Sequence, residues 1–313
     1  MYRSDPVVIQ GWSAFHRLLL SLFKFLAPFI RRLELQNATR SLFRGAQRLL
    51  LVLLHDFPDF LAEYYFSICD AIPPRSIQLR NVVLSAYPPK LVLPDPHLVD
   101  IQTDMSPVPT ILSDFMAPLG DGELRASLDR YLVGRGTTAF PNMLKEQLLI
   151  PGVSSDSSSE RYGLSFMNAL VLYIGATTAA QAKARTGSTA FNPSDPGASL
   201  LAQLASELDL EGQHHLMSAI VMHLRFPSAH TQWYANLALH LFIEVKTENF
   251  QEIATKVLLE RFIVHRPHPW GALVTFIELL RNPKYEFWSL NFVRAVPEIS
   301  TLLESVSASH VTG

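Results

Sequence analysis

Two long apolar stretches constrain the fold of this chain more than any other feature. They run from Leu49 to Pro96 and from Val257 to Pro283. In each, an apolar helical run ends at a compact corner marked by proline and restarts at once. Proline ends a helix because it lacks a backbone donor, and it is well tolerated in the first turn of the next helix. The pattern predicts antiparallel helices stacked on one another as a scaffold.

The composition narrows the classes of protein and of site. Of the 313 residues, 48% are hydrophobic and 17% are charged, against about 25% charged in typical soluble domains. Such a chain buries much of its surface or presents apolar surface to partners. The net charge of −2 gives no general attraction to nucleic acid. The single cysteine, Cys69, excludes an intrachain disulfide and a four-thiolate zinc site.

The N-terminal region indicates neither a membrane span nor a signal peptide. The best candidate for a span, Leu18–Ile30, is interrupted by Ser21, Lys24 and Pro28, and it is shorter than the roughly 20 apolar residues that a span needs. The first ten residues lack the basic-then-apolar order of a signal peptide. Because the chain opens almost directly into a helical pattern, we expect it to continue a longer protein.

Apolar residues recur at helical spacing through the first 85 residues. Three such stripes are separated by short breaks, among them Pro58, and the last ends before the Pro73-Pro74 pair. They predict three amphipathic helices with short joints. The stripes consist of Trp12, Phe15, Leu18, Leu19, Leu22, Phe23, Leu26, Phe29, Ile30 and Leu33; of Leu42, Phe43, Ala46, Leu49, Leu50, Leu53, Leu54 and Phe57; and of Phe60, Leu61, Tyr64, Tyr65 and Ile68.

Prolines change the character of the chain over residues 86–109. Those at positions 88, 89, 94, 96, 107 and 109 prevent a regular helix and predict an extended segment on the surface. Shorter helices are expected after it, over Thr110–Met116, Gly122–Val133 and Thr137–Ile150, and a long one over Tyr162–Ala184. Polar runs at 154–159 and 186–195 predict loops.

The last third of the chain is again strongly periodic. Asp195-Pro196 predicts a capped helix start. Further helix boundaries are predicted at Gly212, Pro227, Thr247, Pro267–Pro269, Pro283 and Pro297. The spacing of these marks, about 12–20 residues, suits helix pairs of about 40 residues, the length of HEAT repeats. We therefore predict an all-α fold, a HEAT-like helical-repeat solenoid of stacked antiparallel helix pairs. It forms one domain over residues 1–313, with N-terminal repeats at 1–85, the proline-rich segment at 86–109 and C-terminal repeats at 110–309.

The usual catalytic signatures are incomplete. Gly163-Leu-Ser165 lacks the second glycine of a nucleophile elbow, and Gly134-Arg-Gly136 lacks the third glycine of a dinucleotide turn. No phosphate-binding loop of the GxxxxGK type occurs, and the 28 acidic residues are dispersed. We predict no enzyme, no catalytic residue, no cofactor and no metal. A hydrolase stays open only if histidine and carboxylate side chains converge in a pocket.

Histidine is the most tempting of the reactive residue types. His265 and His268 have metal-like spacing, but a proline lies between them and no catalytic glutamate follows the first, so a structural corner is favoured. His214 and His215 point about 100° apart on a helix and cannot easily share a metal. Cys69, near the end of an aromatic-rich helix, predicts a buried packing thiol rather than a nucleophile.

Arg40, Arg44 and Arg48 recur every four residues and form a basic row on one face of a predicted helix. The simplest interpretation is a solvated helix face. The functional alternative is a docking strip for an acidic peptide or for a phosphate backbone. A lone basic row rarely suffices for nucleic acid without neighbouring patches or aromatic platforms.

A second candidate surface consists of aromatic residues around two proline-marked corners. Side chains of this kind wedge successive helices together, or they line an apolar groove for an extended partner segment. Our hypothesis is that a partner segment lies along them. The residues are Trp270, Tyr285, Phe287, Trp288 and Phe292.

Several long segments of the chain resemble the C-terminal domain of the Not-one scaffold family, the large central subunits of the Ccr–Not mRNA deadenylase complex. The resemblance extends from about Gly11 to Val306 and is weakest over His97–Glu160 and Thr186–Ser199. The segments are LLVLLHDFPDFLAEYYFSICDAIPP, IQLRNVVLSAYPPKLVLPDP, NALVLYIGATTAAQ, LRFPSAHTQWY, LLERFIVHRPHPWGALVTFIELLRNP and FWSLNFVRAVPEI.

The resemblance implies a non-catalytic domain of HEAT-like repeats in a cytoplasmic and nuclear protein that supports mRNA deadenylation, decay and translational repression. In that family the domain binds extended regions of the Not-two and Not-three/Not-five subunits, and it receives short linear motifs of RNA-binding repressor proteins. Deadenylase subunits dock elsewhere on the scaffold. No membrane and no strong direct nucleic-acid binding are expected. The competing class is a direct RNA-binding helical module that uses the Arg40/Arg44/Arg48 face.

Overall fold

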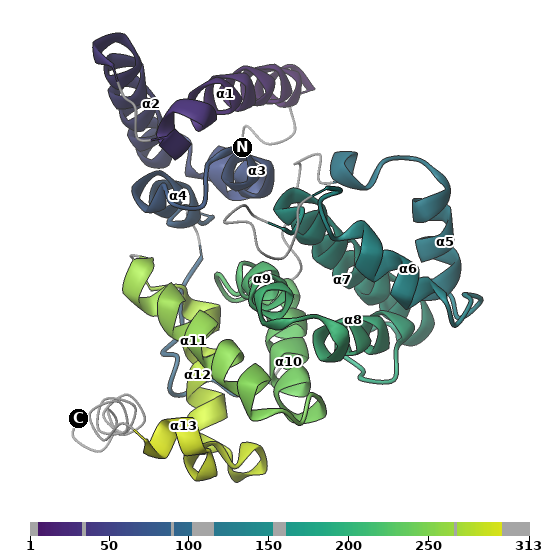
Figure 1. Cartoon of the computed structure of the whole chain (residues 1–313). Coiled ribbons are helices and arrows are strands. Elements are labelled where there is room, and N and C mark those ends of the chain that lie inside the picture. The colour runs from purple at the N-terminus through teal and green to yellow at the C-terminus, as the bar shows by residue number, and fades with distance from the viewer. Residues whose placement is uncertain are drawn as a thin grey trace, which may run out of the picture. The chain divides into compact units, whose positions relative to one another are not determined.

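The computed structural model of the chain is all α-helical in the residues that it describes (Figure 1). These are residues 6–32, 36–88, 91–101, 116–152, 161–265 and 268–295, with only the backbone described at 6–10 and 32. Within these ranges, β-type pairing is limited to one isolated bridge between Leu149 and Tyr162. The predicted all-α class is confirmed, and the packing of each helix on its neighbours is consistent with a helical solenoid.

The described chain divides into two compact units. The first contains the chain up to Val92, together with Val264 and His265. The second contains the described residues from Leu93 onward, apart from those two. The single domain over 1–313, with its predicted subdivision at 86–109, stays a prediction.

The described residues of the first unit form four helices, and the third of them, α3, packs against the other three. Figure 1 shows α3 beside α1 and α4. Every residue of α3 from Phe60 to Cys69 is buried. The rings of Trp12 and Phe60 meet edge to face at 5.5 Å and hold α1 on α3. The helices are α1 (Pro6–Arg32), α2 (Asn37–Asp56), α3 (Pro58–Ala71) and α4 (Ile77–Leu84).

A buried polar contact between α1 and α3 was not predicted. His16 is 5% exposed, and its Nε2 lies 2.6 Å from the Ser67 hydroxyl. Its ring also stacks on Tyr64, with 4.3 Å between centroids. A stripe of apolar residues does not reveal such a position, because a polar side chain can be buried once it has a hydrogen-bond partner.

The first predicted stripe is divided between two faces of α1. Leu19, Phe23 and Leu26 are buried, as predicted. Leu18 and Phe29 lie on an exposed face, and Leu18 has 69% of its surface accessible. The helix therefore has a buried core face and a second, exposed apolar face. The sequence periodicity predicted a single apolar stripe that contains residues of both.

Helix α1 is also longer and more continuous than the N-terminal prolines and polar residues suggested. Pro28 lies inside it rather than interrupting it. Among the described residues, the stretch Gly11–Arg31 is long and apolar enough to cross a membrane on length and composition alone, and 28% of its most apolar window is buried. The sequence argument considered only Leu18–Ile30, so the absence of a membrane contact stays a prediction.

The second unit contains the remaining described helices and three short 3₁₀ turns. The helices predicted at 122–133, 137–150 and 162–184 are present with shifted ends, whereas 110–115 lie outside the described residues. The elements are η1 (Ala117–Leu119), α5 (Glu123–Leu132), α6 (Phe140–Gln147), α7 (Leu164–Thr186), α8 (Pro196–Glu207), α9 (Leu210–Val221), α10 (Ala229–Glu244), α11 (Glu248–Val264), α12 (Trp270–Arg281), η2 (Pro283–Tyr285), η3 (Phe287–Ser289) and α13 (Asn291–Arg294).

Two predicted helix marks act differently from the expectation. Asp195 precedes α8, but its side chain makes no capping bond and instead pairs with Arg185 at 2.8 Å. Gly212 lies inside α9 rather than at its start, and its backbone N–H donates to the capping carboxylate of Asp209 at 2.9 Å. In both cases the cause is a hydrogen-bond partner, Arg185 for Asp195 and Asp209 for Gly212. A rule based on residue type alone does not take such partners into account.

Helix α7 packs closely against α10 because Gly175 leaves room for a tyrosine. Tyr234 on α10 donates its hydroxyl to the Val171 carbonyl at 3.0 Å. A Cβ atom at Gly175 would lie 2.2 Å from the Tyr234 oxygen and 3.0 Å from the Trp233 ring. Such a separation is far inside van der Waals contact, so this glycine is required by the close approach of the two helices.

We expect Gly175→Ala to lower the free energy of unfolding by about 1–3 kcal/mol, because the added methyl group overpacks the core. The matched control is Gly45→Ala, also in a helix but with open space around the added atom. That change should stabilise by about 0.5–1 kcal/mol through helix propensity. Urea midpoints of the two variants measure both effects. Equal shifts of the urea midpoint in Gly175→Ala and Gly45→Ala would contradict the close approach of α7 and α10 at Gly175.

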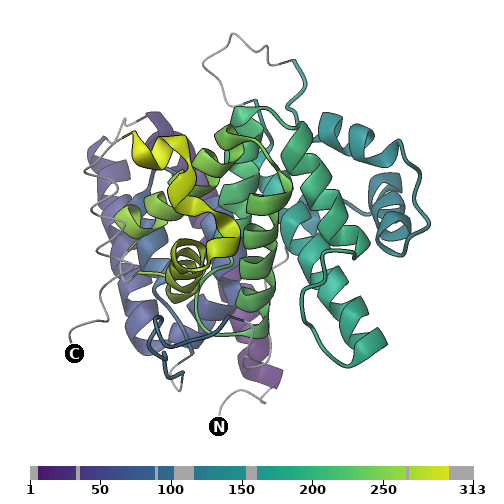
Figure 2. The ribbon, with the colours of Figure 1, turned by 90° about the horizontal axis from the view of Figure 1, so that it is seen from below.

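The C-terminal turns lie beside α12, as Figure 2 shows in yellow. Glu248 of α11 fixes the start of α13. Its carboxylate accepts the backbone N–H groups of Asn291 at 2.6 Å and Phe292 at 3.3 Å, and the Asn291 side-chain amide at 2.8 Å. The amide of Asn291 and these backbone donors lower the pKa of Glu248. A carboxylate at a helix N-terminus satisfies donors that would otherwise be unpaired.

Candidate functional site

The predicted aromatic surface forms a packed cluster around Phe287. This ring is 1% exposed, and it lies 5.6 Å from Trp288 and 6.2 Å from Phe292, with both pairs edge to face. It also lies 6.3 Å from Phe242 on α10. Tyr285 is 9% exposed and contacts the same Phe242 ring at 6.4 Å. The cluster attaches the C-terminal turns to the helices of the second unit.

The Trp288 and Phe292 side chains are half-buried, in contrast to Phe287. The indole N–H of Trp288 donates to the Leu280 carbonyl at 2.8 Å, which joins η3 to the end of α12. Of the two interpretations of these aromatics, wedging of successive elements accounts for the contacts described. A docking role for the accessible parts of Trp288 and Phe292 stays a prediction.

Trp270, the remaining aromatic candidate, holds a segment of this chain itself. It is 5% exposed, and its indole N–H donates to the Pro94 carbonyl at 2.8 Å. Two more side chains bind carbonyls of the same segment: Arg281 donates to His97 at 3.2 Å, and Gln232 donates to Ile101 at 2.8 Å. The part of the predicted extended segment that the second unit includes, residues 93–101, is therefore tied to α10 and α12.

We expect Trp270→Phe to lower the free energy of unfolding by about 0.5–1.5 kcal/mol, since it removes one hydrogen bond while keeping an aromatic ring. The same change should increase proteolytic cleavage within residues 93–101, because one of the three carbonyl contacts is lost. Limited proteolysis read by mass spectrometry measures this effect. Trp288→Phe is the matched control, and cleavage there should stay as in the parent. Equal cleavage of all three proteins would contradict the assignment.

The basic row is exposed on α2, as predicted. Arg40, Arg44 and Arg48 are all exposed, and Arg44 and Arg48 line a groove of about 330 Å³ between α2 and α4. Gln47, Leu51, Gln78, Leu79 and Val82 complete its walls and floor. The sequence had indicated the arginines but not the apolar floor, because the floor comes partly from a second helix.

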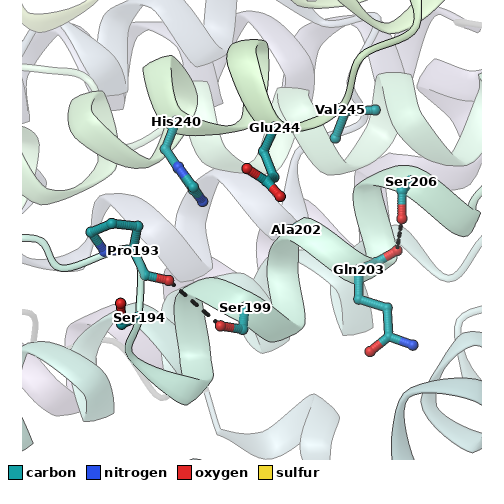
Figure 3. Close-up of a pocket in the computed structure, with 9 residues that line it drawn as sticks. All are labelled: Pro193, Ser194, Ser199, Ala202, Gln203, Ser206, His240, Glu244 and Val245. Carbon is teal, nitrogen blue, oxygen red and sulfur yellow. Dashed lines mark hydrogen bonds between the residues drawn. The ribbon is translucent and has the colours of Figure 1, made fainter.

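A larger cleft of about 610 Å³ lies between α8 and α10 (Figure 3). His240 and Glu244 project into it from α10, one helical turn apart, and Ser199 and Gln203 of α8 line the opposite side. Burial lowers the pKa of His240, an effect that the charge of Lys284 reinforces and that Glu244 opposes. The sequence prediction missed this cleft, because its only local signal is the four-residue spacing of His240 and Glu244.

The cleft brings histidine, carboxylate and serine together but lacks the geometry of a nucleophilic site. A nucleophile and its base must lie within hydrogen-bond reach of each other. Ser199 instead donates to the Pro193 carbonyl at 3.5 Å, and Ser206 donates to the Gln203 carbonyl at 2.8 Å (Figure 3). Among the described side chains, none bonds a serine hydroxyl to His240. The arrangement can bind polar groups of a ligand, but it assembles no Ser–His pair.

The other histidine candidates occupy structural positions. Asn81 donates its amide to the Val264 carbonyl at 2.7 Å, and His265 Nδ1 bonds the Asn81 side-chain oxygen. The predicted corner is thus closed by Asn81 together with His265. His214 pairs with Glu260 at 3.2 Å, and Cys69 is fully buried. In the part of the chain that the structure describes, no group of three His, Cys, Asp or Glu side chains is arranged to hold a metal ion.

Comparison with known proteins gives one consistent similarity along nearly the whole chain. The family model "CCR4-Not complex component, Not1" matches residues 8–307. "CCR4-NOT transcription complex subunit let-711" of Caenorhabditis elegans is 38% identical over 309 residues, which are 96% of this chain and 11% of that protein. "General negative regulator of transcription subunit 1" of Schizosaccharomyces pombe is 34% identical over 305 residues, which are 93% of this chain and 14% of that protein.

Two solved structures have a similar fold. The NOT1 superfamily homology domain from Chaetomium thermophilum superposes with a TM-score of 0.79 at 26% identity, over 95% of this chain and 58% of that one. A Not1 C-terminal domain solved in complex with Not4 gives a TM-score of 0.76 at 27% identity, over 97% of this chain and 60% of that one.

Proposed function

The chain belongs to the Not1 family of CCR4-Not complex components, and we propose that it is a non-catalytic scaffold domain that binds other subunits of that complex. The match of the family model over residues 8–307 is the observation that carries this proposal. A similar domain was solved in complex with Not4, which supports protein binding as the role of this fold.

The contacts of the described residues support a binding role over a catalytic one. Stacked helices give a continuous surface for extended partner segments. The cleft between α8 and α10 has polar side chains but no serine bonded to His240, so it suits recognition rather than acyl transfer. The Caenorhabditis elegans relative is named as a subunit of the CCR4-NOT complex, which agrees with this role.

In finer detail, we propose that the partners are the Not-two and Not-three/Not-five subunits, Not4, and short linear motifs of RNA-binding repressor proteins. The protein then supports mRNA deadenylation, decay and translational repression in the cytoplasm and nucleus. Trp288 and Phe292 keep accessible surface and are the aromatic residues through which such a segment could bind.

Co-expression of the tagged chain with each candidate subunit tests the proposal. We expect stoichiometric co-elution from a size-exclusion column with Not-two together with Not-three/Not-five, and with Not4. Elution of a folded chain separately from all of them would overturn it. Trp288→Ala and Phe292→Glu then test the docking position, and undiminished binding with an intact fold would remove these residues from the interface.

The second candidate function is direct RNA binding through Arg40, Arg44 and Arg48, which the exposed basic row favours. It requires strongly salt-dependent binding of RNA by the isolated chain, lost on charge reversal of that row. The groove beside the row is lined by aliphatic and amide side chains, with no aromatic platform for bases. This lining favours a peptide ligand over RNA.

A further inference from the structure

The groove between α2 and α4 combines a positive rim with an apolar floor. Arg44 and Arg48 form the rim, one helical turn apart, and both are exposed. Leu79 is 1% exposed and forms part of the floor, and Leu51 extends the apolar surface outward with 53% of its area accessible. The volume of about 330 Å³ is near the lower end of the roughly 300–1,000 Å³ found for ligand pockets, which suits a short segment.

The charged residues that line this groove, Arg44 and Arg48, are both positive. No carboxylate lines it. Helix α4 contains no acidic residue, and α2 contains only Asp56, at its last position, where it bonds His55 at 2.6 Å. Arg44 and Arg48 form no ion pair with any residue that the structure describes. Two uncompensated guanidinium groups thus face solvent in a protein whose net charge is −2.

This combination selects the chemistry of a ligand. Guanidinium groups bind carboxylates or phosphates with directed hydrogen bonds. An apolar floor gains free energy only when an apolar group covers it. Arg44 and Arg48 lie about 6 Å apart along the helix axis, a distance that two acidic side chains of one short peptide can match.

We propose that the α2–α4 groove is a docking site for a short peptide segment in which acidic residues flank leucine or a similar apolar residue. The inference rests on the proposed role as a partner-binding domain and names one surface and one ligand chemistry for it. The acidic side chains pair with Arg44 and Arg48, and the apolar side chain covers Leu79 and Val82. RNA offers phosphates that can pair with Arg44 and Arg48, but it has no aliphatic side chain to cover Leu79 and Val82.

Fluorescence anisotropy tests the site with a labelled ten-residue peptide in which two glutamates alternate with two leucines along the chain. The comparison probes replace every glutamate with lysine, or every leucine with serine, and a twelve-nucleotide polyadenylate RNA serves as the nucleic-acid probe. We expect the glutamate–leucine peptide to bind at least tenfold more tightly than any of the three. Equal or tighter binding of the serine peptide or the RNA would overturn the proposal.

Variants locate the binding in the groove. Arg44→Glu with Arg48→Glu, and separately Leu51→Glu, should each weaken peptide binding at least tenfold. The matched control is Arg135→Glu with Lys183→Glu, which makes the same change in net charge at exposed positions elsewhere. Unfolding midpoints verify that every variant is folded. Equal losses in the control and the groove variants would show a general charge effect and would sink the assignment.

The same variants separate this inference from the proposed function. If subunits co-elute with the parent chain but the peptide does not bind, the groove assignment fails and the scaffold role stands. If the peptide binds in the groove but no subunit co-elutes, the scaffold role fails while the surface chemistry holds.

Discussion

Phe287→Ala is expected to lower the free energy of unfolding by about 3–5 kcal/mol, the usual cost of removing a buried aromatic side chain. The ring is 1% exposed and contacts Phe242, Phe276, Trp288 and Phe292. Its removal leaves a cavity at the point where the C-terminal turns meet the helices, and the surrounding rings can collapse into it only partly. Urea unfolding followed by circular dichroism gives the change as a shift in midpoint.

The matched control is Phe25→Ala on α1, where the ring is 57% exposed. That substitution should stay within about 0.5 kcal/mol of the parent. If Phe287→Ala lowered the free energy of unfolding by less than 1 kcal/mol, the ring would contribute little to the core. A direct role of Phe287 in partner docking would then be favoured again. Phe287→Leu should recover part of the lost stability, because it refills most of the cavity.

The free energy of unfolding is expected to fall by about 2–3 kcal/mol between pH 7.5 and pH 4.5 because of one histidine pair, in which His223 is buried and His230 half-buried. His230 Nε2 lies 3.2 Å from His223 Nδ1, and the His223 ring stacks on Tyr234 at 4.3 Å. Burial, with the charge of Arg225, lowers the pKa of His230 from 6.5 to about 4. Burial also lowers the pKa of His223, and the charges of His230, Arg261 and Arg225 add to this effect.

The direction follows from the protons bound by each state. Between pH 4 and 6.5 the unfolded chain protonates His230 and the folded chain does not. Stability therefore rises with pH across this window and is fully present above it. Unfolding by urea at several pH values measures the slope. His230→Gln should reduce the slope relative to the parent protein. An unchanged slope in His230→Gln would contradict the assignment.

Much of the helical framework could be predicted from the sequence. Pro58 begins α3, and the periodic run after it is buried throughout from Phe60 to Cys69. The long helix predicted at 162–184 corresponds to α7. These predictions hold because proline chemistry and the 3.6-residue period act within a few residues. Predictions that depended on one residue type, such as the cap at Asp195 and the helix boundary at Gly212, were less accurate, because other partners bind the same groups.

The candidate surfaces were predictable only in part. The exposed basic row was visible in the sequence, but the apolar floor beside it comes from Leu79 and Val82 on another helix. The cleft that faces His240 likewise needs Ser199 and Gln203 from α8. Trp270 was one of the aromatic residues predicted to wedge helices or to line a groove, and its indole donates to the Pro94 carbonyl, far away in sequence. The spacing of residues along the sequence does not show which distant helices pack together, so these contacts could not be predicted from it.

The sequence by itself determined that this chain is helical, where most of its helices lie, and which family it resembles. Local rules suffice for the first two features, because helix periodicity and proline corners involve neighbours along the chain. The family resemblance rests instead on the likeness of several long segments. Only the tertiary structure decided which apolar face of α1 is buried, that Phe287 is a core residue, and which side chains border each groove. Those outcomes depend on contacts between residues distant in sequence, and burial is a property of the packed helices rather than of any one of them.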